Sequence, residues 1–172
     1  MGVYFNPSNE SFTQAKNSMI YIDKTGLIEQ LNKRLSTEDK CIAVSHARRF
    51  GKSHAAGMID AYYSLGCDST KLFENTTIAK NEDFKQYMNK FNVIHLDISS
   101  VWDFHKEDLV EAIHRRICDD FKEEYGEELD YGKDLYLLIQ EIYRKTRIPF
   151  VIIIDEWDCI IRNSKDEGLI HK

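Results

Sequence analysis

Apolar residues along this chain fall into two patterns: short continuous runs, and longer stretches with one apolar face. Continuous apolar runs predict strands covered on both faces at 41–45, 92–99 and 148–154. Helical spacing of apolar residues predicts helices at about 25–35, 52–65, 81–91, 106–125 and 135–145. Because strands alternating with helices indicate βαβ units around a parallel sheet, the pattern predicts an α/β fold.

Residues 1–40 are predicted to form a lead-in that contains one helix. An Asn-Pro-Ser-Asn turn at 6–9 favours an irregular segment over 1–19. Asp23 or Thr25 can cap the helix that follows. We therefore expect a lead-in and helix over 1–40 and a βα core over 41–172, with no internal repeat.

The strand predicted at 41–45 runs into a loop that ends in Gly-Lys-Ser and opens the next helix. This order is typical of a phosphate-binding loop, whose amides and helix N-terminus attract the β-phosphate. Gly51 allows close approach of the backbone, Lys52 would reach the β- and γ-phosphates, and Ser53 would ligate Mg²⁺. The candidate nucleotide-binding residues are His46, Ala47, Arg48, Arg49, Phe50, Gly51, Lys52, Ser53 and His54.

The full pattern G-x-x-x-x-G-K-[ST] has glycine where this chain has His46, so the match is incomplete. The alternative is a helix whose first turn contains a lysine and a serine by chance. Arg48 and Arg49 either contact the γ-phosphate or a base, or are solvated. Phe50 is expected to pack beneath the loop. The strand before this loop, the helix after it and a second motif farther along favour nucleotide binding.

The second motif is an acidic pair, Asp155-Glu156, that follows the strand at 148–154. Carboxylates at the C-terminal end of a strand lie where open α/β sheets bind ligands. Asp155 can hold Mg²⁺ through water, and Glu156 can orient or deprotonate the attacking water. The candidate catalytic residues are thus Glu156 and Lys52, and the candidate metal residues are Ser53 and Asp155. The alternative is a strand that ends in a solvated acidic turn.

Three further polar residues lie close to these motifs in the predicted arrangement. Asp97 ends the second strand at the expected ligand edge, although capping of the next turn is favoured. Asp23 and Lys24 either line the adenine side of a nucleotide or are a helix cap and a solvated lysine. These alternatives remain open from the sequence.

Composition restricts the class of protein and its compartment. The 172 residues include 23 Lys+Arg and 29 Asp+Glu, and the net charge of −6 gives no global attraction to nucleic acid. The chain shows neither a membrane-spanning apolar run nor a signal peptide. The 4 cysteines are scattered without a C-x-x-C pair, and Cys41 and Cys159 are expected to be buried. We expect a reduced, cytoplasmic protein with no membrane partner.

Three elements in a fixed order resemble the bacterial and archaeal proteins with an AAA-ATPase-like P-loop domain. They are Asp23-Lys24-Thr25, Arg48-Arg49-Phe50-Gly51-Lys52-Ser53 and Ile154-Asp155-Glu156-Trp157-Asp158. This chain has His46-Ala47 where members usually have Arg-Pro, and Trp157 where they usually have Tyr. Neither difference alters the Gly-Lys-Ser or the Asp-Glu chemistry, and the resemblance spans most of the chain.

The resemblance implies an ASCE-type P-loop NTPase fold, a three-layer sandwich with a mainly parallel sheet, and ATP with Mg²⁺ as cofactors. In such sheets a later strand lies between the first and the third, but this chain ends soon after its third predicted strand. We therefore expect the N-terminal part of a longer protein, or a partner chain such as a second copy that supplies the missing strand. Full-length members usually add a C-terminal domain that looks like a PD-(D/E)xK nuclease, through which alone nucleic acid would bind.

Two functions from different classes follow from these motifs. The first is Mg²⁺-dependent ATP hydrolysis with Glu156 as the base, and its arginine finger or sensor cannot be assigned. The second is a nucleotide-dependent switch that controls an attached effector domain with little or no hydrolysis. A metal site for nucleic-acid cleavage at Asp97, Asp155 and Glu156 is disfavoured, because no Glu-x-Lys follows a suitable Asp and the chain is acidic.

Overall fold

The computed structural model describes residues 2–45, 50–106 and 108–163. Its α-helices and strands are, in chain order, α1 (Glu10–Lys16), α2 (Gly26–Asn32), α3 (Lys52–Tyr63), α4 (Thr70–Phe73), α5 (Phe84–Tyr87), β1 (Asn92–Asp97), α6 (Ile98–Trp102), α7 (Leu109–Tyr125), α8 (Leu135–Thr146), β2 (Phe150–Asp155) and α9 (Cys159–Asn163). Short 3₁₀ turns occupy Glu38–Lys40, Ile78–Lys80 and Gly126–Glu128. The mixed α/β class predicted from the sequence is confirmed.

The sheet consists of β1 and β2, which pair in parallel over their full lengths. The register sets His95 opposite Ile153 and Asp97 opposite Asp155, so both strands end in a carboxylate at the same edge. The N-terminal segment lies along the other side of β1, where Phe5 forms an antiparallel bridge with Ile94. The prediction of an irregular segment over 1–19 is therefore wrong in part: Phe5 bridges to β1, and α1 occupies Glu10–Lys16.

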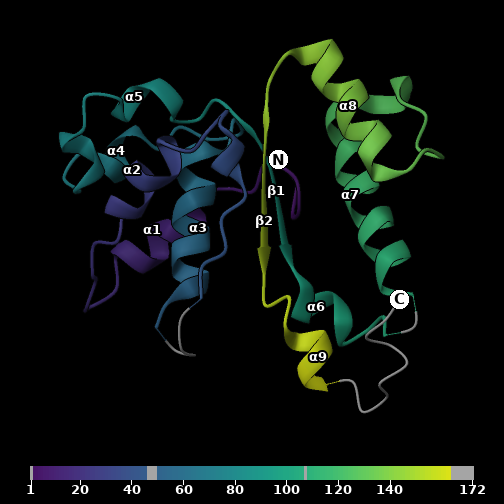
Figure 1. The fold of residues 1–172 in the computed structure, drawn as a ribbon, viewed down its shortest axis with the longest axis horizontal. Helices are drawn as coiled ribbons and strands as arrows, with labels where there is room; N and C mark the ends of the chain where they lie inside the picture. The colour runs from purple at the N-terminus through teal and green to yellow at the C-terminus, as the bar shows by residue number, and fades with distance from the viewer. Residues whose placement is uncertain (1, 46–49, 107, 164–172) are drawn as a thin grey trace.

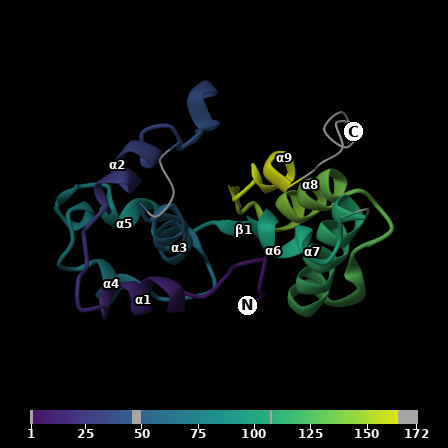
Figure 2. The same ribbon diagram turned by 90° about the horizontal axis from the view of Figure 1, so that it is seen from below.

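Helices cover the sheet on both faces (Figure 1). Helices α1 to α5 lie on one side and α7 and α8 on the other, so the elements form three layers. Alternation along β1 explains the division. Val93 packs in the core beneath α3, whereas Ile94 and Leu96 pack in the core with α7 and α8. Figure 2 shows the two helical groups on either side of the strands from a second direction.

The strand predicted at 41–45 is wrong. Residues 41–45 are neither helical nor paired, and Ile42 and Val44 are 42% and 56% exposed. A strand gains its stability from the neighbour that it pairs with, and within the described residues this segment has none. Cys41, expected to be buried, is exposed for the same reason, whereas Cys159 is buried as predicted.

The helix predicted at 81–91 is present only as α5, because the chain turns at Asn89. That residue adopts a left-handed backbone with φ of 55°. Its side-chain amide donates to the carbonyl oxygens of Ala61 at 3.1 Å and Ser64 at 2.8 Å. These bonds hold the turn against the end of α3 and direct the chain into β1. Among the described residues, no helix combines the length and apolar character that crossing a membrane requires.

Candidate functional site

A sharp bend at Gly51 opens α3. Gly51 has φ of 76°, a left-handed conformation that glycine adopts without steric cost. Lys24 supports this bend, since its ammonium group donates a hydrogen bond to the carbonyl oxygen of Phe50. A Cβ atom added at Gly51 would lie 2.9 Å from Lys24 Nζ. The bend expected of a phosphate-binding loop is thus present, directly before Lys52 and Ser53.

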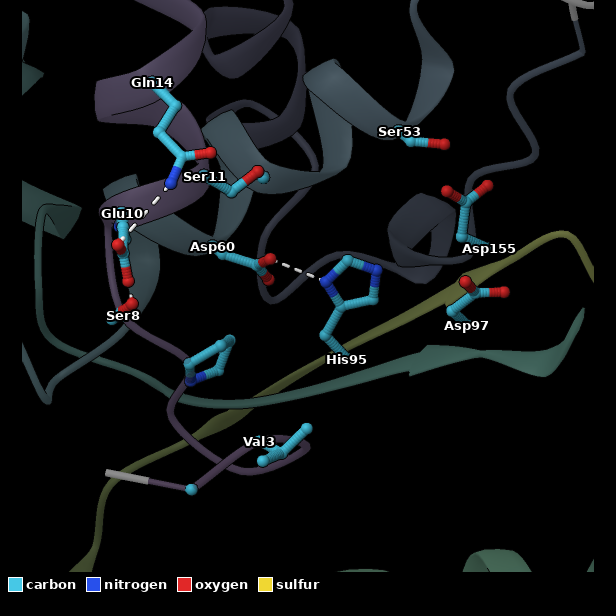
Figure 3. A pocket seen from close by; sticks show the side chains of 13 residues that line it. Val3, Ser8, Glu10, Ser11, Gln14, Ser53, Asp60, His95, Asp97 and Asp155 are labelled. Carbon is cyan, nitrogen blue, oxygen red and sulfur yellow. Dashed lines mark hydrogen bonds and ion pairs between the residues drawn. The ribbon is translucent and has the colours of Figure 1, made fainter. Parts of the chain in front are cut away.

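An open cavity of about 550 Å³ lies between α3, the two strands and the N-terminal segment with α1. Ser53, Gly57 and Asp60 line it from successive turns of α3, on one face of that helix. The strands contribute His95, Asp97 and Asp155. Figure 3 shows the side chains of Ser53, Asp97 and Asp155 around one end of this space, with Asp60 and His95 farther in. The structure therefore places both predicted metal residues, Ser53 and Asp155, along one cavity.

Asp97 and Asp155 end neighbouring strands but have different partners. The Asp97 carboxylate accepts from the amide of Ser99 at 3.0 Å and from its hydroxyl at 2.7 Å, and so caps the N-terminus of α6. The capping role favoured for Asp97 is confirmed. Oδ1 of Asp155 accepts the amide of Glu156 at 2.9 Å, and the side chain lines the cavity.

Glu156 is held by Arg162, a residue of α9. Its carboxylate lies 2.6 Å from Arg162 Nη2, and Arg162 Nε lies 3.0 Å from Asp158. Glu156 has a left-handed backbone with φ of 50° and is not among the cavity-lining residues. The structure therefore does not bring the predicted base into the cavity with Ser53 and Asp155.

The remaining predicted residues of the loop are distributed around the start of α3. Lys52 is its first residue and is partly exposed, and His54 in the same turn is exposed. Phe50 is 56% exposed, so the expectation that it packs beneath the loop is wrong. Four of the predicted nucleotide-binding residues lie outside the described residues: His46, Ala47, Arg48 and Arg49.

Asp23 joins two parts of the chain rather than facing the cavity. Its carboxylate accepts from the amides and hydroxyls of Thr25 and Thr77 at 2.7–2.9 Å. Burial raises the pKa of Asp23, but these four hydrogen bonds outweigh it and hold the pKa below its usual value. Asp23 thus fixes the turn from which Lys24 reaches the Gly51 bend.

Sequence reasoning did not single out Asp60 and His95, which line the inner part of the cavity. Their side chains meet at 2.6 Å between Asp60 Oδ2 and His95 Nδ1. Burial lowers the pKa of His95, but the hydrogen bond and the charge of Asp60 outweigh burial and leave the pKa raised. One feature of the sequence could have pointed to these residues: each is a polar residue among apolar ones, His95 in a predicted strand and Asp60 in a predicted helix.

The donor set at the outer end of the cavity fits Mg²⁺. Within the described ranges, no group of three or more His, Cys, Asp or Glu side chains is arranged to hold a metal ion. Asp97, Asp155 and Glu156 are therefore not gathered into such a group. At phosphate sites Mg²⁺ is instead bound by one or two protein oxygens together with water and phosphate oxygens. The Ser53 hydroxyl and the Asp155 carboxylate can provide the protein oxygens.

Comparison with known proteins identifies a family for this chain. The model of a family described as predicted AAA-ATPase matches residues 9–172, nearly the whole chain. No curated protein and no solved structure matches significantly. The matched range includes every cavity-lining residue from Glu10 onward and all three elements on which the sequence resemblance is based.

Proposed function

Since this chain belongs to the family of predicted AAA-ATPases, which indicates nucleotide binding, we propose that it binds ATP with Mg²⁺ at the start of α3 and hydrolyses it. The observation that supports this most is that Ser53 and Asp155 line one cavity. They lie 102 positions apart in sequence (155 − 53) and come from a helix N-terminus and a strand C-terminus. Parallel α/β sheets bind ligands at this edge.

In this proposal the protein binds the triphosphate through the bend and the first turn of α3. The amides around Gly51 and the positive end of the α3 dipole attract the β-phosphate. Lys52, as the first residue of α3, reaches the β- and γ-phosphates. We assign residues 46–50 and His54 to the same site from the sequence motif alone. The arrangement of bend, helix and strand end supports an ASCE-type P-loop fold, which we also propose.

Ser53 and Asp155 would hold the metal ion, Ser53 by its hydroxyl and Asp155 directly or through water. When bound, Mg²⁺ would neutralise charge that develops on the phosphate oxygens. Glu156, which follows Asp155, would orient the attacking water and accept its proton. For this step the carboxylate must turn from Arg162 toward the nucleotide.

The contact between Arg162 and Glu156 favours a second candidate function. A base held at 2.6 Å by a guanidinium, outside the cavity, suits a protein that binds ATP and hydrolyses it slowly. Such a protein would act as a nucleotide-dependent switch on an attached effector domain. Tight ATP binding without measurable phosphate release would select this function over the ATPase.

Calorimetric titration of the Lys52→Ala variant tests nucleotide binding. We expect the variant to lose ATP binding, because it lacks the side chain that neutralises the β- and γ-phosphates. Lys145→Ala is the matched control, since Lys145 lies in α8 on the opposite side of the sheet, beside Glu141. Titration with GTP in parallel determines the base preference. Equal ATP affinity in the wild type and Lys52→Ala would overturn the proposal.

A further inference from the structure

Asp60 and His95 connect α3 to β1 at the inner part of the cavity (Figure 3). Asp60 Oδ2 and His95 Nδ1 lie 2.6 Å apart, and Asp60 is only 4% exposed. Asp60 belongs to the helix that opens with Lys52, and His95 to the strand that pairs with β2. One contact thus joins the helix that begins the proposed phosphate site to the sheet that ends in Asp155.

This contact is the main compensation for burying Asp60. Oδ1 of Asp60 is buried and has no hydrogen-bond partner among the described residues. A buried carboxylate needs hydrogen bonds or an opposite charge to offset its lost hydration. His95 provides that hydrogen bond to Oδ2. Sliding α3 along the sheet would break it and leave Asp60 buried without a partner. The pair therefore fixes one position of the helix on the strands.

The same position determines how Ser53 faces Asp155. Asp60 comes about two helical turns after Ser53 and lies on the same face of α3. In the sheet, His95 pairs with Ile153, and Asp155 follows two positions later on β2. The Asp60–His95 contact and the Ser53–Asp155 pair are thus two points of one helix–sheet contact, both lining the cavity.

We propose that Asp60 and His95 are positioning residues for the metal end of the nucleotide site, because their contact holds the Ser53 hydroxyl opposite the Asp155 carboxylate. This inference rests on the proposed function. It assigns neither residue a contact with the nucleotide or the metal. The inference predicts that ATP affinity has two contributions. The Mg²⁺-dependent contribution needs the Ser53–Asp155 geometry, whereas the Mg²⁺-independent contribution needs the loop and Lys52.

The test compares ATP affinity with Mg²⁺ and with EDTA in His95→Ala. We expect the gain in affinity on adding Mg²⁺ to fall by about 10–100-fold, the usual effect of removing a residue that orients a metal ligand. Affinity in EDTA should stay within about twofold of the wild type. His95→Asn, whose amide can donate to Asp60 from a similar place, should restore most of the Mg²⁺ effect.

His114→Ala is the matched control for loss of a half-buried imidazole. His114 lies on α7, on the opposite face of the sheet, and its Nε2 is 2.9 Å from the carbonyl oxygen of Lys133. We expect this variant to keep the wild-type Mg²⁺ effect. If His95→Ala does not fold, Asp60→Asn takes its place, since it preserves side-chain volume and weakens the same contact.

A double-mutant cycle with Ser53→Ala distinguishes positioning from general stability. If Asp60 and His95 act through Ser53, then His95→Ala causes little further loss of the Mg²⁺ effect once Ser53 is alanine. Full additivity of the two losses would overturn the inference. So would an unchanged Mg²⁺ effect in His95→Ala, or an equal loss of affinity with Mg²⁺ and with EDTA. Failure of the proposed function is separate, because then the wild type itself does not bind ATP.

Discussion

Arg162 Nη2 lies 2.6 Å from Glu156 Oε2, and this ion pair keeps the predicted base on its own turn after β2. The two side chains are about 30% exposed, so water partly screens their attraction. A carboxylate held in this way can exchange one partner for another at modest cost. In the proposed function, this pair is therefore the point at which hydrolysis would be controlled without a change in nucleotide binding.

Replacement of Glu156 by glutamine tests whether this carboxylate is the base. We expect Glu156→Gln to bind ATP as the wild type does and to hydrolyse it about 10²–10⁴-fold more slowly, because the amide cannot accept a proton. Calorimetry gives the affinity, and phosphate release gives the rate. Glu141→Gln is the control, because Glu141 lies in α8 and forms an ion pair with Lys133. A Glu156→Gln variant with the parental rate shows that the assigned base is wrong.

Removal of the guanidinium tests the restraint on Glu156. We expect Arg162→Gln to hydrolyse ATP several-fold faster with unchanged ATP affinity, because the carboxylate loses the partner that holds it outside the cavity. Arg144→Gln is the control, since Arg144 lies on α8 and bonds Gln140 at 3.2 Å. A slower or unchanged rate in Arg162→Gln would mean that Arg162 does not restrain the base.

The bend before α3 can be tested at Gly51. We expect Gly51→Ala to lower the melting temperature and weaken ATP binding. A left-handed alanine costs about 1–2 kcal/mol, and its Cβ would displace Lys24 Nζ, 2.9 Å away. Gly126→Ala is the matched control, because Gly126 also has positive φ but nothing lies within 4 Å of an added Cβ. The control should lose stability and keep ATP affinity; equal affinity in both variants would contradict a role for the bend.

We expect the hydrogen bonds from Thr25 and Thr77 to Asp23 to stabilise the fold in a pH-dependent way. The pKa of Asp23 is lower in the folded protein than its ordinary value of 3.8. The unfolded state therefore binds the proton more readily, so the contribution is present above about pH 4 and is lost as pH falls through the folded pKa. Melting temperatures of the wild type and Asp23→Ala should differ at pH 6, and the difference should shrink as the pH falls below about 4. A difference that does not shrink in acid would contradict this account.

The sequence predicted most of the elements that position the site. β1, α3 and α7 lie within the predicted ranges, and β2 and α8 each extend one residue beyond them, because each has an apolar pattern on the face that it buries. The juxtaposition of Ser53 and Asp155 followed from the rule that parallel strands end at one ligand-binding edge. These predictions depended on local pattern and on general topology alone.

The predictions that failed depended on which distant segment lies nearby. Residues 41–45 have the composition of a strand, but within the described part of the chain they have no pairing partner. The Glu156–Arg162 and Lys24–Phe50 contacts depend on side-chain directions that an apolar pattern does not encode. Asp60 and His95 were not singled out because each is one polar residue in an apolar stretch, and only the fold brings the two into contact.

The most direct test of the central claim is calorimetric titration of ATP into the wild type and Asp155→Asn, each with Mg²⁺ and with EDTA. The claim is that Ser53 and Asp155 form one metal–nucleotide site across the cavity. We predict that Mg²⁺ strengthens ATP binding to the wild type and has little effect on Asp155→Asn, while both bind ATP similarly in EDTA. An equal Mg²⁺ effect in the two proteins, or no binding by the wild type, would contradict the account.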